Sequence, residues 1–144
     1  AQSLEVESLV FTREQFYNSR EVLDLLLERD IDYIVLAGFL WLVPDYLLKP
    51  YENKIVNIHP ALLPKYGGKG MYGKRVHRAV IDAGENESGI TIHHVNQDYD
   101  DGDIIFQASC VVEPGESPES LAKKIHELEY SYFPTVVENL LKKL

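Results

Sequence analysis

An asparagine–histidine pair and an acidic turn in this sequence have the chemistry needed to add a nucleophile to a carbonyl carbon. Asn57 and His59 lie two residues apart, and the acidic turn, residues 98–102, follows about forty residues later. An amide donor and an imidazole can stabilise an oxyanion, and a carboxylate can accept or relay a proton. The residue types therefore indicate a catalytic site. The alternative is that Asn57 and His59 are structural residues of a strand.

The position of this pair favours the catalytic interpretation. Residues 54–59 are rich in β-branched side chains and predict a strand that ends at Pro60. Side chains alternate along a strand, so Asn57 and His59 point to the same face. Open α/β sheets bind ligands beyond the C-terminal ends of their strands. We therefore expect a ligand site at this end of the sheet.

The elements around the pair alternate as in an α/β domain. Residues 34–37 form a continuously apolar run, which predicts a strand buried on both faces. The chain pattern predicts a doubly wound, mostly parallel sheet with an antiparallel edge near the C-terminus. Expected strands are 4–11, 34–37, 54–59, 89–95 and 104–112, and expected helices are 13–29, 44–48, 73–83, 117–132 and a last one from Pro134.

Composition limits the function classes. The 144 residues predict a single domain, and no apolar run is long enough to cross a membrane, so we expect a cytoplasmic protein without a membrane partner. A net charge of −9 opposes nonspecific binding to nucleic acid. Cys110 lies among apolar neighbours and is expected to be a core thiol.

The other histidines and the acidic turn do not predict a metal site. His93 and His94 alternate in facing, so at most one of them can share the site, and His77 and His126 are expected on solvated helix faces. Residues 96–107 lack the glycine position and the final glutamate of a calcium loop. The glycine-rich segment 64–70 lacks the spacing of a P-loop, and we interpret it as a mobile surface loop. We expect no bound metal.

Longer motifs resemble the family of folate-dependent glycinamide ribonucleotide formyltransferases. The segment 57–66, Asn-Ile-His-Pro-Ala-Leu-Leu-Pro-Lys-Tyr, resembles the family's catalytic strand and loop. The glycine-rich segment 67–73 with the following His77 resembles its purine-pathway version, and 36–39, 98–105 and 127–129 extend the match over nearly the whole chain. The resemblance implies a Rossmann-like formyltransferase domain.

The resemblance also implies roles for individual residues. The family's catalytic residues fall on Asn57, His59 and Asp100, and a carboxylate near His59 would favour its cationic form. The implied folate-binding residues are Arg13, Leu40, Trp41, Leu42, Val43, Asn57, Asn96, Gln97, Asp98, Tyr99 and Asp100. The implied ribonucleotide-binding residues are Glu129 and His126.

The implied reaction is transfer of a formyl group from 10-formyltetrahydrofolate to the amine of 5-phosphoribosylglycinamide in purine biosynthesis. The implied partners are these small molecules, and a homodimer is compatible with the resemblance. A formyltetrahydrofolate hydrolase, a tRNA formyltransferase and a non-catalytic folate-binding module remain alternatives. The family begins with a strand and a glycine-rich phosphate-binding loop that the 144 residues lack, so we expect residues 1–144 to be an N-terminally incomplete formyltransferase domain.

Overall fold

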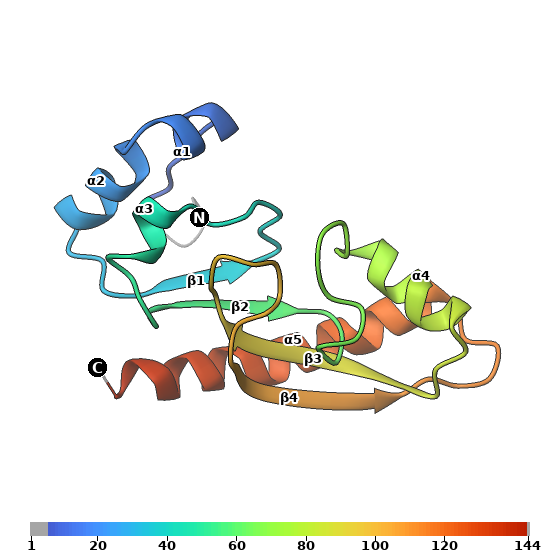
Figure 1. The fold of residues 1–144 in the computed structure, drawn as a ribbon. Helices are drawn as coiled ribbons and strands as arrows, with labels where there is room; N and C mark the ends of the chain where they lie inside the picture. Colours follow the sequence, from blue (N-terminus) through green and yellow to red (C-terminus); the bar gives the residue numbers. More distant parts are fainter. Residues whose placement is uncertain (1–5, 144) are drawn as a thin grey trace. The chain divides into compact units, whose positions relative to one another are not determined.

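The computed structural model describes residues 6–143 and separates the chain into two compact units (Figure 1). The first unit ends at Asp32 and the second begins at Tyr33. The elements are α1 (Arg13–Asn18), α2 (Glu21–Glu28), β1 (Ile34–Ala37), α3 (Asp45–Leu48), β2 (Ile55–His59), α4 (Lys74–Asp82), β3 (Glu87–His94), β4 (Ile104–Val111) and α5 (Pro118–Leu141).

The first unit consists of two short helices where the sequence predicted one. Thr12 and Gln15 form the capping box that starts α1, with each side chain bonded to the other residue's backbone amide. Ser19 then adopts an extended backbone, and its hydroxyl donates to the carbonyl of Gln15 and accepts from the amide of Glu21. This local bonding competes with the helix and separates α1 from α2. The predicted strand over 4–11 is absent from its described part, residues 6–11.

The second unit is built on a four-stranded mixed sheet in the order β1-β2-β3-β4. The β1–β2 pair is parallel, and the β2–β3 and β3–β4 pairs are antiparallel. The α/β class and the antiparallel edge near the C-terminus are thereby confirmed. The prediction that β1 is buried on both faces is wrong, because β1 is an edge strand of the described sheet and Val35 is 42% exposed.

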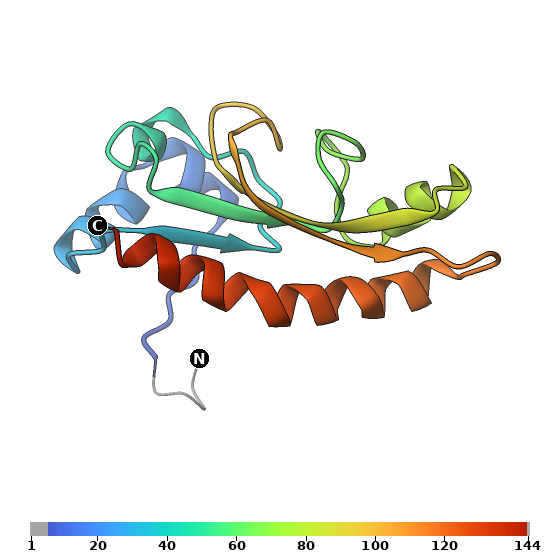
Figure 2. The ribbon, with the colours of Figure 1, turned by 90° about the horizontal axis from the view of Figure 1, so that it is seen from below.

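Helix α5 covers one face of the sheet, whereas the loops before α4 and after β3 rise on the opposite face (Figure 2). Ser117 caps the helix by accepting a hydrogen bond from the amide of Ser120, and Pro118 occupies its first turn. The predicted break at Pro134 does not occur, and α5 continues through it to Leu141. Proline removes only one helical hydrogen bond, and the apolar packing of Phe133 and Val136 on the core keeps the helix together.

The packing of the core between α5, α4 and the sheet determines which strand side chains point away from α5. Ile58 of β2 and Ile92 of β3 pack with Leu121 and Ile125 of α5. Because side chains alternate along a strand, the neighbours of Ile58 and Ile92 must point to the other face. Asn57, His59 and their β3 counterparts are therefore directed away from α5. No helix in residues 6–143 is long and apolar enough to span a membrane.

Candidate active site

A cavity of about 800 Å³ lies in the second unit, beside the C-terminal ends of β1 and β2. Its wall is formed in part by residues 37–40 at the end of β1 and just beyond it, the end of β2, the loop before α4, Tyr99 and Asp100. Helix α5 contributes further residues, among them His126, Glu129 and Phe133. Asn57, His59 and Asp100 all line this one cavity. The tertiary structure thus brings together the three side chains whose chemistry the sequence indicated.

The strand register pairs Asn57 with His93. The two residues are directly opposite in the antiparallel β2–β3 pair, and Asn57 Nδ2 lies 3.1 Å from His93 Nε2. His93 Nδ1 lies 2.8 Å from the carbonyl of His94, which can only accept, so Nδ1 carries the proton. His93 Nε2 also lies 3.7 Å from Asp100 Oδ1, so Nε2 accepts from the Asn57 amide only while the ring is neutral. The neutral ring of His93 therefore fixes the direction in which the Asn57 amide points.

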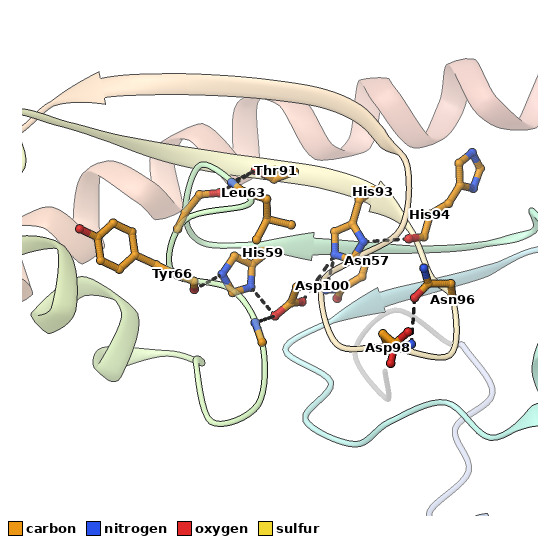
Figure 3. Close-up of polar contacts among 12 residues, drawn as sticks. Asn57, His59, Leu63, Tyr66, Thr91, His93, His94, Asn96, Asp98 and Asp100 are labelled. Carbon is orange, nitrogen blue, oxygen red and sulfur yellow. Dashed lines mark hydrogen bonds and ion pairs between the residues drawn. The ribbon is translucent and has the colours of Figure 1, made fainter.

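His59 is held by one hydrogen bond to the backbone and faces a carboxylate (Figure 3). Its Nε2 donates to the carbonyl of Tyr66 over 2.8 Å, and its Nδ1 lies 3.5 Å from Asp100 Oδ2. Tyr66 has a φ of 57°, a conformation that only a few per cent of non-glycine residues adopt, and this turn aims its carbonyl at the ring. The 3.5 Å distance from Nδ1 to Asp100 is too long for a strong hydrogen bond. Nδ1 is therefore the ring nitrogen that can form a hydrogen bond with a bound ligand.

The Tyr66 turn is tied to the end of α4. The Tyr66 hydroxyl donates to Glu85 Oε1 over 2.8 Å, and Lys65 Nζ donates to the same oxygen over 2.8 Å. Glu85 follows Gly84, which stops α4 with a φ of 67°. The sequence prediction of a freely mobile loop over 64–70 misses these contacts, because they join residues twenty positions apart.

Burial and charge act in opposite directions on the titratable groups. His59 is 3% exposed, and burial lowers its pKa more than the charge of Asp100 and the Tyr66 carbonyl raise it. We expected the Asp100 carboxylate to favour the cationic form of His59. In the free protein this expectation is wrong, because the net shift of the His59 pKa is downward. Burial alone raises the pKa of Asp100, but His93, His59 and the Gly68 amide together lower it below its usual value. Asp100 is a carboxylate at neutral pH.

A hydroxyl on β3 anchors the chain that follows His59. Thr91 lies opposite His59 in the register and is fully buried. Its hydroxyl donates to the carbonyl of Ala61 over 2.7 Å and accepts from the amide of Leu63 over 3.0 Å. Gln107 of β4 donates to the Thr91 hydroxyl over 2.8 Å and to the Leu63 carbonyl over 3.1 Å. These contacts hold residues 61–63 against the sheet and so position the Tyr66 turn.

The predicted ribonucleotide-binding residues lie together on α5. His126 Nδ1 is 2.8 Å from Glu129 Oε2, and both residues line the cavity. His77 of α4 also lines it, but the prediction that His77 is solvated is wrong, because it is only 3% exposed. Burial, together with the charges of His126 and His59, lowers the pKa of His77, although Glu129 acts in the opposite direction. His77 Nδ1 finds no hydrogen-bond partner among the described residues.

Only some of the predicted folate-binding residues line the cavity. Leu40, Asn57, Tyr99 and Asp100 line the cavity. Six others do not line it, and these are Trp41, Leu42, Val43, Asn96, Gln97 and Asp98. Arg13 lies on α1 in the first unit, where its guanidinium stands over the ring of Tyr17 at 5.5 Å. Folate contacts of all these residues stay predictions.

No group of three or more histidine, cysteine or acidic side chains within residues 6–143 is arranged to hold a metal ion. Cys110 of β4 is half-buried beside the core, and burial raises the pKa of its thiol.

Comparison with known proteins agrees with this geometry. The model of the formyl transferase family matches residues 3–137, which is most of the chain. This chain belongs to the formyl transferase family. The match includes β2 and the segment between β3 and β4, and therefore Asn57, His59 and Asp100.

Several relatives of this chain carry a common name. A chloroplastic phosphoribosylglycinamide formyltransferase of Arabidopsis thaliana is 44% identical over 117 residues, which are 81% of this chain and 40% of the relative. The phosphoribosylglycinamide formyltransferase of Bacillus subtilis is 32% identical over an alignment of 145 positions, which covers 98% of this chain and 72% of the relative. The chain spans about 40% of the length of the two plant relatives it matches.

Solved structures share the fold of this chain. The crystal structure of phosphoribosylglycinamide formyltransferase from Bacillus halodurans superimposes with a TM-score of 0.86 at 34% identity. The superposition covers 99% of this chain and 73% of that protein. This chain and that structure thus share a fold.

Four residues support the site through contacts that the sequence did not predict. They are Thr91, His93, Tyr66 and Gln107, which contact the residues around Asn57 and His59. Alternation along β3 could have placed Thr91 and His93 on one face, but not opposite His59 and Asn57. That placement depends on the strand register, which the sequence alone did not provide.

Proposed function

We propose that this protein transfers a formyl group from 10-formyltetrahydrofolate to the primary amine of 5-phosphoribosylglycinamide. The observation that carries the proposal is the convergence of Asn57, His59 and Asp100 on one cavity. Family membership and the common name of the relatives support the same reaction.

In the proposed reaction the substrate amine attacks the formyl carbon. A carbon–nitrogen bond forms, and the carbonyl electron pair moves onto the formyl oxygen. The second N–H of the Asn57 amide and a protonated Nδ1 of His59 donate hydrogen bonds to this oxyanion. The attacking amine loses a proton to Asp100, directly or through water. The oxyanion then re-forms the carbonyl as the bond between the formyl carbon and the folate nitrogen breaks, and the folate nitrogen receives the proton held by Asp100, directly or through water.

The electrostatics of the cavity suit this sequence of events. Burial keeps His59 from holding a proton strongly in the free protein, whereas a developing oxyanion beside it favours the charged ring. The hydrogen bond from His59 is thus strongest when negative charge appears on the formyl oxygen. An interaction that strengthens in the transition state accelerates the chemical step.

We further propose that the cavity wall divides between two small-molecule substrates. Leu40, Tyr99 and Asp100 are on the proposed folate side, and Glu129 and His126 are on the proposed ribonucleotide side. Glu129 is a carboxylate suited to an ammonium group. A cytoplasmic site of action stays a prediction, because the plant relatives are named as chloroplastic. A homodimer also stays a prediction.

The test is a formyl-transfer assay with both substrates, performed on the protein and on three variants. His59→Ala and Asp100→Asn should lower kcat by about two to four orders of magnitude, the usual contribution of general acid–base groups. Folate binding, measured by fluorescence titration, should change little. Glu119→Gln serves as the control, because Glu119 lies in the first turn of α5 and does not line the cavity.

Three outcomes would contradict the proposal. Near-normal turnover of either site variant would remove that residue from the mechanism. Release of formate from 10-formyltetrahydrofolate without the amine substrate would instead support a hydrolase. Folate binding with no turnover of any kind would support a non-catalytic binding module.

A further inference from the structure

The basic residues of this acidic protein are concentrated next to the cavity. The chain carries a net charge of −9, yet residues 53–81 contain six lysines and arginines and no aspartate or glutamate. This segment includes β2, the glycine-rich loop and most of α4. A local excess of positive charge attracts anions whatever the net charge of the protein.

Two of these cations, Lys69 and Arg75, line the cavity itself. Neither forms an ion pair with any residue in the described part of the chain. The cavity carboxylates do not use them, since Asp100 accepts from the Gly68 amide and faces His59, and Glu129 bonds to His126. The positive charge of both side chains is therefore available to a ligand.

The loop also holds the Arg75 guanidinium in place. The guanidinium carbon stands 5.0 Å from the centre of the Tyr72 ring, a cation–π arrangement. A side chain added at Gly70 would come within 3.9 Å of Arg75 Nη1, so the guanidinium passes close to the loop backbone. The base of the loop is fixed by the 3.0 Å bond from Gly68 to Asp100. An ordered guanidinium loses less entropy when it binds.

We propose that Lys69 and Arg75 form a subsite for an oxyanion of a bound substrate, either a carboxylate or a phosphate. The proposal rests on the proposed function, because both of its substrates carry such groups: the folate ends in glutamate carboxylates and the ribonucleotide in a phosphate. A guanidinium binds two oxygens of either group at once, and an ammonium adds a second charge. The subsite contributes to substrate affinity and does not take part in the chemical step.

The test compares Lys69→Gln and Arg75→Gln with the controls Lys74→Gln and Arg78→Gln. The control residues belong to the same basic segment, but they do not line the cavity. Each cavity variant should raise KM for one substrate about tenfold, the effect of losing one charged hydrogen bond. The kcat should stay within about threefold, and the control variants should behave like the unaltered protein.

Truncated substrates identify which oxyanion is bound. If the group is the carboxylate, Arg75→Gln should have no effect with a formyl folate that lacks its glutamate. If the group is the phosphate, the same variant should have no effect with the glycinamide riboside. Unchanged KM values for both complete substrates, or equal effects of the control variants, would overturn the proposal.

A direct binding measurement separates this proposal from the proposed function. Isothermal titration with folic acid and with ribose 5-phosphate requires no turnover. At least one of these probes should bind about tenfold more weakly to Arg75→Gln than to Arg78→Gln. Equal binding of both probes to the two variants would overturn the subsite, even in a protein that transfers formyl groups. Weaker binding by Arg75→Gln in a protein without formyl transfer would uphold the subsite and refute the proposed function.

Discussion

Replacing Thr91 with valine removes one hydroxyl group from the buried face of β3 and leaves the size of the side chain almost unchanged. The hydroxyl is the partner of the Ala61 carbonyl and of the Leu63 amide. Both of these backbone groups belong to buried residues, at 0% and 7% exposed. Each buried polar group left without a partner costs about 1–3 kcal/mol. We therefore expect Thr91→Val to lower the free energy of unfolding by about 2–5 kcal/mol.

The matched control is Thr91→Ser, which keeps the hydroxyl and loses one buried methyl group. Its expected cost is about 1 kcal/mol. The serine variant should therefore be more stable than the valine variant, the opposite of the order that burial of apolar surface alone predicts. Urea unfolding followed by circular dichroism gives both values.

A valine variant as stable as the unaltered protein would refute this account of Thr91. A valine variant more stable than the serine variant would also refute it, because apolar burial would then outweigh the lost hydrogen bonds. If the account holds, Thr91→Val should also lower turnover, since residues 61–63 lead to the Tyr66 carbonyl that holds His59.

Two further predictions follow from the buried histidines. Asp100→Asn should lower the pKa of His59 further, because the Asp100 charge raises it; an NMR titration of the ring that shows an equal or higher pKa would contradict this. Burial lowers the folded-state pKa of His77, so its contribution to stability is complete above the unfolded value near 6.5 and is lost as pH falls toward the folded value. Between about pH 7.5 and about pH 5.5, the free energy of unfolding should therefore fall less in His77→Gln than in the unaltered protein. Urea titrations that show an equal or larger fall in His77→Gln would contradict this prediction.

Local signals in the sequence were sufficient for most elements of the fold. The cap at Ser117 and the apolar runs of β1 to β4 predicted where those elements lie. The predictions failed where a local signal competed with bonding or packing. Ser19 interrupted a helix whose apolar periodicity continued, whereas Pro134 did not interrupt α5, whose apolar side chains pack on the core. Periodicity alone does not reveal which of these opposing effects is stronger.

The sequence alone determined the chemical types at the site. The spacing of Asn57 and His59 after apolar strand residues placed both on one face, and motif resemblance added Asp100. The tertiary structure decided how these groups are held. The β2–β3 register put His93 and Thr91 opposite them, and chain folding brought the Tyr66 carbonyl to His59 Nε2.

The charge state of His59 also required the tertiary structure. Its pKa depends on the balance between a nearby carboxylate and the loss of water around the ring. The sequence shows that the carboxylate exists, but the extent of burial depends on how β2, β3 and the loop before α4 pack together. Desolvation is a property of the folded surroundings, so only the three-dimensional structure could show that it outweighs the carboxylate.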